Sequence, residues 1–360
     1  MIHHRILVET SNSGQRRPKG KRRLFEDRSF PGALAMLSIF AFALLSCTTE
    51  SPQVRFDHER QMSSAPAAVP ARKATPPFYR VDGGRGATLQ LLGTIHLGPE
   101  EGWTFPPRVD GAIETASSVL LEIDLRDMTE EEVSQTVIRH GILPADTPLS
   151  KLISTETKKL IEKHEDALTM SGAPPHVREA MQPWFIMMLL AETTIQQSGM
   201  SVKYSVEESL METLDGRELL SLESLDQQLA FFGELPIPVQ ELMLRQTLNE
   251  WDDALSQLEE MVEAWRTHDE TALLRIAYDG IGEVPGLRAF YDVLIDGRNR
   301  SWTPRLVELL EDPARSGTSV VVAVGALHLV GPAGVPSLLR EAGYRVDDRS
   351  EGNRGDAGQP

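Results

Sequence analysis

Apolar residues near both ends of the chain form two runs that predict buried strands followed by a loop. The first run, LQLLGTIHLGPEEG, covers residues 89–102, and the second, VVVAVGALHLVGPAGV, covers residues 320–335. Each contains Gly-x-x-His-Leu, followed by a small loop with Gly and Pro. Continuous apolar runs bounded by Gly and Pro are typical of strands that are buried on both faces. The two runs lie more than two hundred residues apart, so local duplication does not explain them.

A helix and a second short strand are predicted after each run. The predicted strands are Thr88–Leu97, Ser118–Leu125, Ser319–Leu329 and Tyr344–Asp347, and the helices between them are Pro107–Ala116 and Val335–Ala342. The sequence at each end of the domain therefore predicts a strand–GxxH–helix–strand unit. Such units are expected in a parallel or mixed sheet with crossover helices.

The middle of the chain has mainly helical periodicity, with helix starts at Pro, Ser or Asp. Arg217–Glu223 (RELLSLE) is short and apolar and follows Asp215-Gly216, so it predicts a strand. We therefore expect one α+β domain, with a central mixed sheet from both chain ends and a large helical insertion around it. The predicted helices are Leu149–Ala167, Pro174–Gln197, Val206–Leu214, Leu225–Phe232, Pro238–Leu248, Asp252–His268 and Thr271–Tyr278.

The first 47 residues have the composition of an export signal. A basic stretch precedes the uncharged apolar segment Phe30–Ser46, and Leu44-Leu45-Ser46-Cys47 resembles a lipobox. Arg22-Arg23 leaves both Sec and Tat export open. We predict a lipoprotein signal peptide at 1–47 with Cys47 as the lipidated residue; the alternative is an ordinary thiol near a single membrane anchor. The protein would then be anchored in the bacterial cell envelope, facing the periplasm or exterior, in the outer membrane if the cell is Gram-negative.

Composition sets the other boundaries and excludes one class of partner. Residues 48–77 are rich in Ser, Pro, Ala and charge, which predicts a disordered tether. We expect residues 78–348 to form the folded domain and residues 349–360 to form a disordered tail. The net charge is −17, although the first 47 residues carry eight Lys or Arg against three Asp or Glu. So acidic a domain argues against nucleic acid, because phosphate binding needs a positive surface.

Two histidines and a glutamate carry the first candidate chemistry. His96 and His328 are each predicted at the end of a strand, where ligand sites gather in sheets with crossover helices. Two imidazoles brought together can bind a divalent metal, or one can act as a base. Glu122 lies within SVLLEIDL, where an unpaired buried carboxylate costs several kcal/mol. The alternative is that strand alternation places Glu122 on a polar face.

For Glu223, and for the pair Arg298 and Asn299, the sequence allows two interpretations each. Glu223 closes the RELLSLE strand and either favours the following helix electrostatically or points into the strand-end site. Arg298 and Asn299 lie in a predicted polar break between helices, where they would orient a carboxylate or stabilise an oxyanion, or else form an exposed loop. No HExxH or GxSxG is present, which argues against a zincin and an ordinary serine hydrolase.

These motifs, in this order, resemble the TraB/GumN family, which includes Tiki-type metalloproteases and PrgY-like pheromone-shutdown proteins, over most of Thr88 to Val346. Many members have a Gly-x-Asp ahead of the second acidic segment, where the nearest acidic residue here is Glu207. The acidic residue before Arg-Asn is Asp296, one position early. The matching residues are Gly93-Thr94-Ile95-His96, Leu121-Glu122-Ile123, Pro183-Trp184, Leu222-Glu223 with Gln227, Arg298-Asn299, and Gly325–Leu329 with Gly331.

The resemblance implies an envelope-anchored hydrolase, a metal-dependent peptidase acting on extracytoplasmic peptides or proteins. It implies manganese or cobalt, with zinc as a third option, held by His96, His328 and Glu223. Glu122 is then the general base, with Arg298 and Asn299 beside it, and the roles of the two glutamates are exchangeable. Erythromycin-esterase-like proteins share the fold, so a metal-independent esterase using a GxxH histidine is one alternative. A non-catalytic lipoprotein that binds a peptide or polysaccharide is another.

Overall fold

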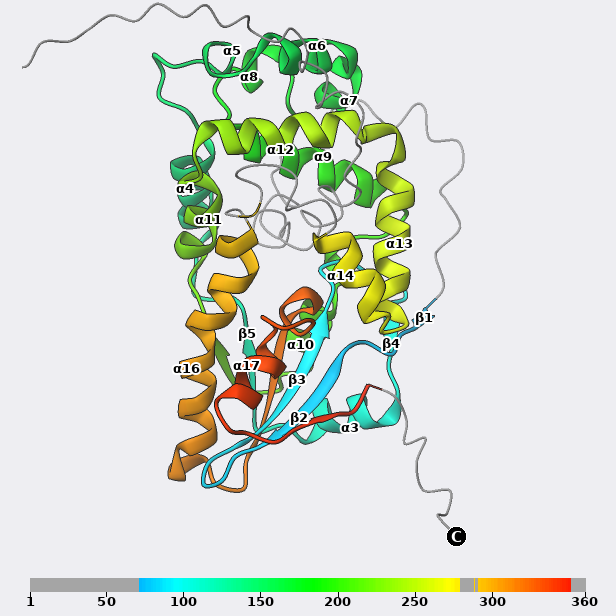
Figure 1. The fold of residues 1–360 in the computed structure, drawn as a ribbon, viewed down its shortest axis with the longest axis vertical. Helices are drawn as coiled ribbons and strands as arrows, with labels where there is room; N and C mark the ends of the chain where they lie inside the picture. Colours follow the sequence, from blue (N-terminus) through cyan, green and yellow to red (C-terminus); the bar gives the residue numbers. More distant parts are fainter. Residues whose placement is uncertain (1–70, 279–287, 289–290, 351–360) are drawn as a thin grey trace, which may run out of the picture.

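The computed structural model describes residues 71–278, 288 and 291–350. A six-stranded mixed sheet lies in the lower half of the view in Figure 1, and helices cover its upper end. The strand order is β6-β5-β7-β3-β2-β8. The fold class predicted from the sequence, α+β with a central mixed sheet, is confirmed. The strands are β2 (Phe78–Asp82), β3 (Thr88–Thr94), β5 (Ser118–Leu121), β6 (Glu218–Ser221), β7 (Ser319–Gly325) and β8 (Val346–Asp348).

Four neighbouring strands run parallel and hold the two Gly-x-x-His motifs side by side. β3 pairs with β7 from Thr88↔Ser319 to Thr94↔Gly325, and β5 pairs with both β7 and β6. β2 then joins β3, and β8 joins β2, both antiparallel. Parallel strands need a crossover connection, and α3 (Pro107–Thr115) lies in the one between β3 and β5, which flank β7. Since β3 and β7 are adjacent, His96 and His328 follow neighbouring strand ends.

Strand alternation divides the core between the two faces of the sheet. Leu120 and Val322 point to one face and pack with residues of α16 (Arg298–Glu311) and α17 (Val335–Glu341). Leu121 and Val321 point to the other face and belong to a larger cluster that includes most of the helical insertion. Both faces are therefore covered, as expected for parallel strands with continuous apolar sequences.

Most of the helices lie between β5 and β7 in the sequence, with β6 interrupting them. Figure 1 shows α9 and α12 crossing above the sheet, with α16 running down one side of it. The elements are α4 (Glu130–Gly141), α5 (Leu149–Leu152), α6 (Thr155–Lys163), α7 (Glu165–Met170), α8 (Pro175–Arg178), α9 (Pro183–Gln197), η1 (Val202–Tyr204), α10 (Val206–Glu212), α11 (Leu225–Gly233), α12 (Ile237–Asn249), η2 (Trp251–Asp253), α13 (Ala254–Arg266), α14 (Glu270–Tyr278), the π-helical turn η4 (Asp292–Gly297), η5 (Pro313–Arg315) and η6 (Ala326–His328).

Two helices predicted as continuous are interrupted. Leu149–Ala167 is divided among α5, α6 and α7, because the Ser154 side chain accepts a hydrogen bond from the backbone N–H of Thr157 and starts a new helix. Pro174–Gln197 is divided between α8 and α9, because Met181 forms a β-bridge with Ile142. Helix α4 was not predicted, although its Thr129–Glu132 capping box is a recognisable helix start.

The chain enters the described domain along a small parallel sheet, in which β1 (Arg72–Lys73) pairs with β4 (Trp103–Thr104). The β1 residues and Thr75 belong to the span predicted as a tether, and the N–H of Thr75 donates to the carbonyl of Arg266 at 2.8 Å. The predicted signal peptide, Cys47 and the tail beyond residue 350 lie outside the described residues. In the described ranges, no helix is both long and apolar enough to cross a bilayer.

Candidate functional site

Four side chains predicted for the site follow the carboxyl ends of the four parallel strands. His96 and His328 come two and three residues after β3 and β7, while Glu122 and Glu223 come one and two residues after β5 and β6. The N–H of Glu223 donates to the carbonyl of Glu122 at 2.9 Å, so the two acidic residues leave neighbouring strands together. All four residues are buried, none more than 8% exposed. They therefore meet at one edge of the sheet.

Glu122 is a buried carboxylate with a full set of donors. It shares the alternation parity of Leu120, which is completely buried against the α16 side of the sheet, so the polar-face alternative is wrong. Its Oε1 accepts from the N–H of Gly325 at 2.8 Å, and its Oε2 from Arg298 Nη2 at 2.6 Å and Gln228 Nε2 at 3.0 Å. Burial opposes ionisation, but the Arg298 guanidinium, the two histidines and the N–H of Gly325 together outweigh it and lower the pKa of Glu122 to about 2. Glu122 is thus an anion at neutral pH.

Glu223 points into the same site and does not cap the next helix. The cap of α11 is Ser224, whose side chain accepts from the N–H of Gln227. Arg298 Nε lies 3.1 Å from each oxygen of Glu223, and Nη2 donates to Oε2 at 2.8 Å. Trp302 Nε1 donates to Oε1 at 2.7 Å. Both oxygens of Glu223 are therefore occupied.

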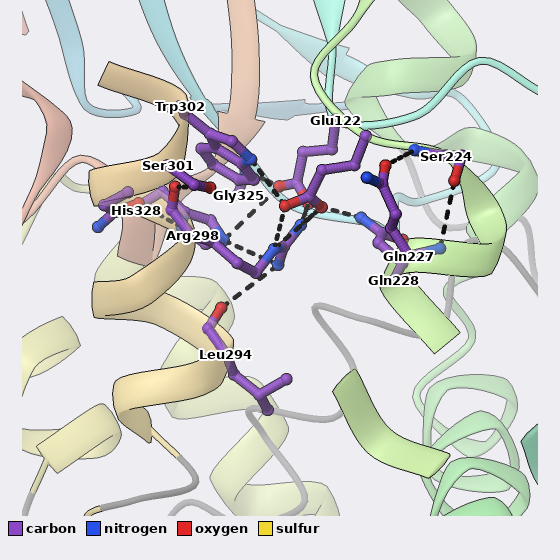
Figure 2. A network of polar contacts seen from close by, with 12 residues as sticks. Glu122, Ser224, Gln227, Gln228, Leu294, Arg298, Ser301, Trp302, Gly325 and His328 are labelled. Carbon is purple, nitrogen blue, oxygen red and sulfur yellow. Dashed lines mark hydrogen bonds and ion pairs between the residues drawn. The ribbon is translucent and has the colours of Figure 1, made fainter. Parts of the chain in front are cut away.

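Arg298 holds the cluster together, as Figure 2 shows. The sequence predicted a polar break here, but Arg298 begins helix α16 and is 1% exposed, so the exposed-loop alternative is wrong. Its guanidinium carbon lies 4.6 Å from the ring centre of Trp302 and 5.7 Å from that of Phe231. These rings shield the guanidinium from solvent, and the two carboxylates supply the countercharge that a buried cation needs.

Asn299 fixes the orientation of the His328 ring. Asn299 Nδ2 donates to the carbonyl of Ala333 at 2.9 Å, which leaves Oδ1 as the acceptor facing His328 Nδ1 at 2.7 Å. Nδ1 therefore carries the proton, and the lone pair of Nε2 faces Arg298 Nη1 at 3.3 Å. Burial lowers the pKa of His328 to about 3. His328 is thus a neutral imidazole with a defined tautomer.

His96 is paired with an acidic residue outside the predicted site set. Its Nδ1 lies 2.9 Å from Oε1 of Glu207 on α10, and both side chains are buried. Burial disfavours the charged imidazole, but the Glu207 carboxylate, aided by Glu122, outweighs it and raises the pKa of His96. The close approach of the His96 segment to the Glu207 segment depends on Gly98, whose N–H and C=O both bond to the backbone of Ser201. A Cβ on Gly98 would lie 1.9 Å from the carbonyl oxygen of Tyr204. The two histidines therefore have opposite electrostatic surroundings.

The three predicted metal ligands do not form a set that fits a metal ion. Both oxygens of Glu223 accept hydrogen bonds from Arg298 and Trp302, and the guanidinium also faces Nε2 of His328. A positive charge at that place repels a cation. Within the described ranges, no group of three or more His, Cys, Asp or Glu side chains is arranged to hold a metal.

A pocket of about 680 Å³ lies between α11 and α16 and opens onto the cluster. Its lining includes Glu223, Phe231, Arg298 and Trp302. Neither histidine nor Glu122 is part of this lining, while Arg298 lines the pocket and also contacts Glu122 and His328. The guanidinium therefore lies between the pocket and the histidine side of the site.

The fold and this cluster define an α+β protein with a buried histidine, carboxylate and arginine site at the carboxyl edge of a parallel sheet. The chain belongs to the TraB/PrgY/gumN family, whose profile matches residues 77–348. The family predicted from the motifs is thus confirmed.

Three relatives have similar sequences over most of their length. The chain is 27% identical over 259 residues to the uncharacterized protein YbaP of Escherichia coli K12, covering 70% of this chain and 88% of YbaP. The Shigella flexneri YbaP is 27% identical over 257 residues, covering 69% of this chain and 87% of the relative. An uncharacterized protein of Treponema pallidum (strain Nichols) is 23% identical over 274 residues, covering 73% and 80%. No solved structure matches the chain.

Three site residues were missed by the sequence reasoning: Glu207, Gln228 and Trp302. Glu207 had one signal, as the acidic residue nearest to the place of the Gly-x-Asp motif in the resemblance described above. Trp302 stands four residues after Arg298, which places both on one face of a helix once the helix is recognised. Gln228 had no signal of its own, since its contact with Glu122 joins residues 106 positions apart.

Proposed function

We propose that this protein is an extracytoplasmic hydrolase that cleaves peptide bonds at the buried cluster. The observation that carries the proposal is the convergence of two oriented imidazoles with a carboxylate–guanidinium pair at neighbouring strand ends. Each imidazole is held at Nδ1, His96 by Glu207 and His328 by Asn299. Orientation of a ring by a second polar group is the arrangement that acid–base catalysis requires.

His96 is assigned the proton transfer. Glu207 lies against Nδ1 and orients the ring, which accepts a proton from an attacking water and returns it to the leaving amine. His328 has a pKa of about 3 and binds a proton too weakly for this role. Its Nε2 serves as a neutral hydrogen-bond acceptor that helps to place Arg298.

Glu122 and Arg298 are assigned orientation and charge stabilisation. A carboxylate with a pKa of about 2 is a weak base, so Glu122 suits the positioning of water better than the general-base role implied by the family resemblance. Arg298 faces the pocket and supplies positive charge opposite the oxyanion that develops on the scissile carbonyl. Peptides are proposed as substrates because the family resemblance includes Tiki-type proteases.

The test uses the full-length protein with fluorogenic peptide and ester libraries, with EDTA and with added manganese or cobalt. We expect peptide cleavage that survives EDTA and falls by about 10²–10⁴-fold in His96→Ala. The matched control is His176→Ala, an exposed histidine on α8. Unchanged cleavage in His96→Ala overturns the assignment.

The same assay separates the alternatives. Cleavage that needs manganese or cobalt and is lost with EDTA favours the metal-dependent peptidase. Turnover of esters alone favours the esterase, and peptide binding without any turnover favours a binding lipoprotein. Each of these outcomes is incompatible with the metal-independent peptidase proposed here.

The envelope location forms a separate part of the proposal and rests on the lipobox-like sequence at Cys47. A lipid-anchored protein carries its domain on the tether that follows the modified cysteine. We expect Cys47→Ser to move the protein from the membrane fraction to the soluble envelope fraction, with loss of lipid labelling. Retention of the variant in the membrane together with unchanged labelling contradicts the anchor.

A further inference from the structure

One edge of the central sheet is open and leads into the site. β6 is the last strand on its side and pairs only with β5 among the strands that the structure describes. The N–H of Leu222 donates to the carbonyl of Leu121 at 3.0 Å, so residue 222 faces β5. Within β6 successive residues direct their backbone groups to opposite sides, so Leu219 and Ser221 face outward; the alternation ends after the strand, where the N–H of Glu223 also donates to the β5 side. Their N–H and C=O groups are the ones that an added strand pairs with.

The two edges of the sheet differ in how they are protected. β8, the opposite edge, carries Asp347, which lies 2.8 Å from Arg345 and 3.8 Å from Arg349. Charged side chains along an edge oppose the addition of another strand. The outward residues of β6 are uncharged, and its single charged residue, Glu218, pairs with Arg315 at 3.0 Å at the end remote from the site. β6 is therefore the more receptive edge.

The open edge continues into the pocket. Leu222 and Glu223 follow β6 directly and form part of the pocket lining, together with Trp302 and Arg305 of α16. A strand advances about 3.3 Å per residue, so a neighbour paired at Ser221 reaches Glu223 after about two further residues. An added strand is thus directed from the edge to the pocket and to Arg298.

We propose that β6 binds an extended polypeptide segment by strand addition and delivers its main chain to the site. Backbone bonds to Leu219 and Ser221 hold the segment with little dependence on its sequence, while the pocket receives the side chains beyond them. The occupant is an unfolded or extended peptide, because a folded protein without a free strand cannot pair with this edge. The catalytic meaning of this site rests on the proposed peptidase function, although binding itself does not require turnover.

The test measures binding apart from cleavage. The probe is a fluorescein-labelled peptide of alternating threonine and valine with a lysine at each end, added to full-length protein that carries His96→Ala. Ser221→Pro removes an outward N–H and none of the bonds between β6 and β5, whereas the control Ser221→Ala keeps that N–H. We expect Ser221→Pro to weaken binding by about tenfold or more and Ser221→Ala to leave it unchanged. The same peptide with N-methylated backbone amides is expected to bind at least about tenfold more weakly.

Equal binding of the methylated peptide overturns the proposal, as does full binding by a Ser221→Pro variant that melts at the temperature of the parent. If Ser221→Pro fails to fold, the methylated peptide decides alone. A change in oligomeric state on Ser221→Pro with unchanged peptide binding identifies β6 as a contact between copies, and also overturns it. Binding that is weakened by Ser221→Pro and by N-methylation supports strand addition. If the parent protein shows such binding but no cleavage, only the peptidase proposal is defeated.

Discussion

Arg298 Nη2 lies 2.6 Å from Oε2 of Glu122 and joins the first turn of α16 to the end of β5. The same nitrogen lies 2.8 Å from Oε2 of Glu223. One buried cation is therefore shared by two buried anions. Removal of the cation leaves two buried carboxylates without their shared guanidinium, which is more costly than loss of an exposed ion pair.

Replacement of Arg298 is expected to destabilise the fold strongly. Arg298→Met keeps much of the side-chain volume but leaves Glu122 and Glu223 without their common partner, so we expect a loss of about 3–5 kcal/mol in the free energy of unfolding. Urea denaturation measures the loss. The control is Arg300→Met, whose side chain is 58% exposed and lies 3.9 Å from Asp296. Equal stability of the two variants contradicts the structural account of the cluster.

The Glu241 carboxylate, which lies away from the site, predicts a loss of stability at acidic pH. Burial opposes ionisation of Glu241, but hydrogen bonds from Ser154 and Thr157 outweigh it and hold the pKa below its ordinary value of 4.5. A lowered pKa in the folded state stabilises the fold above about pH 4.5, and that stabilisation is lost as pH falls through the folded pKa. Glu241→Gln is therefore expected to cost about 1–3 kcal/mol at pH 7, and the difference from wild type is expected to shrink below pH 4.5.

Urea denaturation of both proteins from pH 7 to pH 3.5 checks this dependence. Glu162→Gln, an exposed carboxylate on α6, serves as the control for a general change of charge. A constant difference between wild type and Glu241→Gln across this range contradicts the argument.

The sequence predicted the strand-end histidines because local patterns fix both features that matter. Apolar runs identify β3 and β7, and the Gly-x-x-His motifs place a histidine just beyond each of them. The sequence could not show whether the face of the sheet that carries Glu122 is buried. Alternation shows which residues share a face, but it does not show that α16 covers that face. The pairing of Glu223 with Arg298 joins residues 75 positions apart and depends on tertiary packing alone.

Arg298 was misplaced for a different physical reason. Asp296-Gly297 is typical of a turn, so the segment predicted a break between helices. In the structure Gly297 has helical dihedral angles, φ −67° and ψ −43°, and a Cβ there would lie 2.5 Å from the carbonyl oxygen of Asp292. The glycine permits the close backbone approach of a π-helical turn just before α16. Local composition cannot distinguish this use of glycine from a loop.

Gly98 has a comparable steric role, and its replacement is expected to disturb the His96–Glu207 contact. Gly98→Ala places a methyl group against the backbone of Tyr204, which must move, so we expect a loss of about 1–3 kcal/mol in the free energy of unfolding. Gly111→Ala is the control, because no atom lies within 4 Å of a Cβ at that position in α3. There we expect a gain of about 0.5–1 kcal/mol from helix propensity. Gly98→Ala with a stability equal to that of Gly111→Ala contradicts the close approach.

Glu207→Gln tests the electrostatic asymmetry of the two histidines directly. The carboxylate opposes the effect of burial and raises the pKa of His96, so its replacement by a neutral amide is expected to lower that pKa. The neutral imidazole then persists to lower pH. NMR titration of the histidine ring protons, with His96→Ala used for assignment, measures the change. Glu212→Gln, on the same helix but exposed, is expected to leave His96 unchanged. A His96 pKa that is equal in wild type and Glu207→Gln would show that Glu207 does not control its protonation.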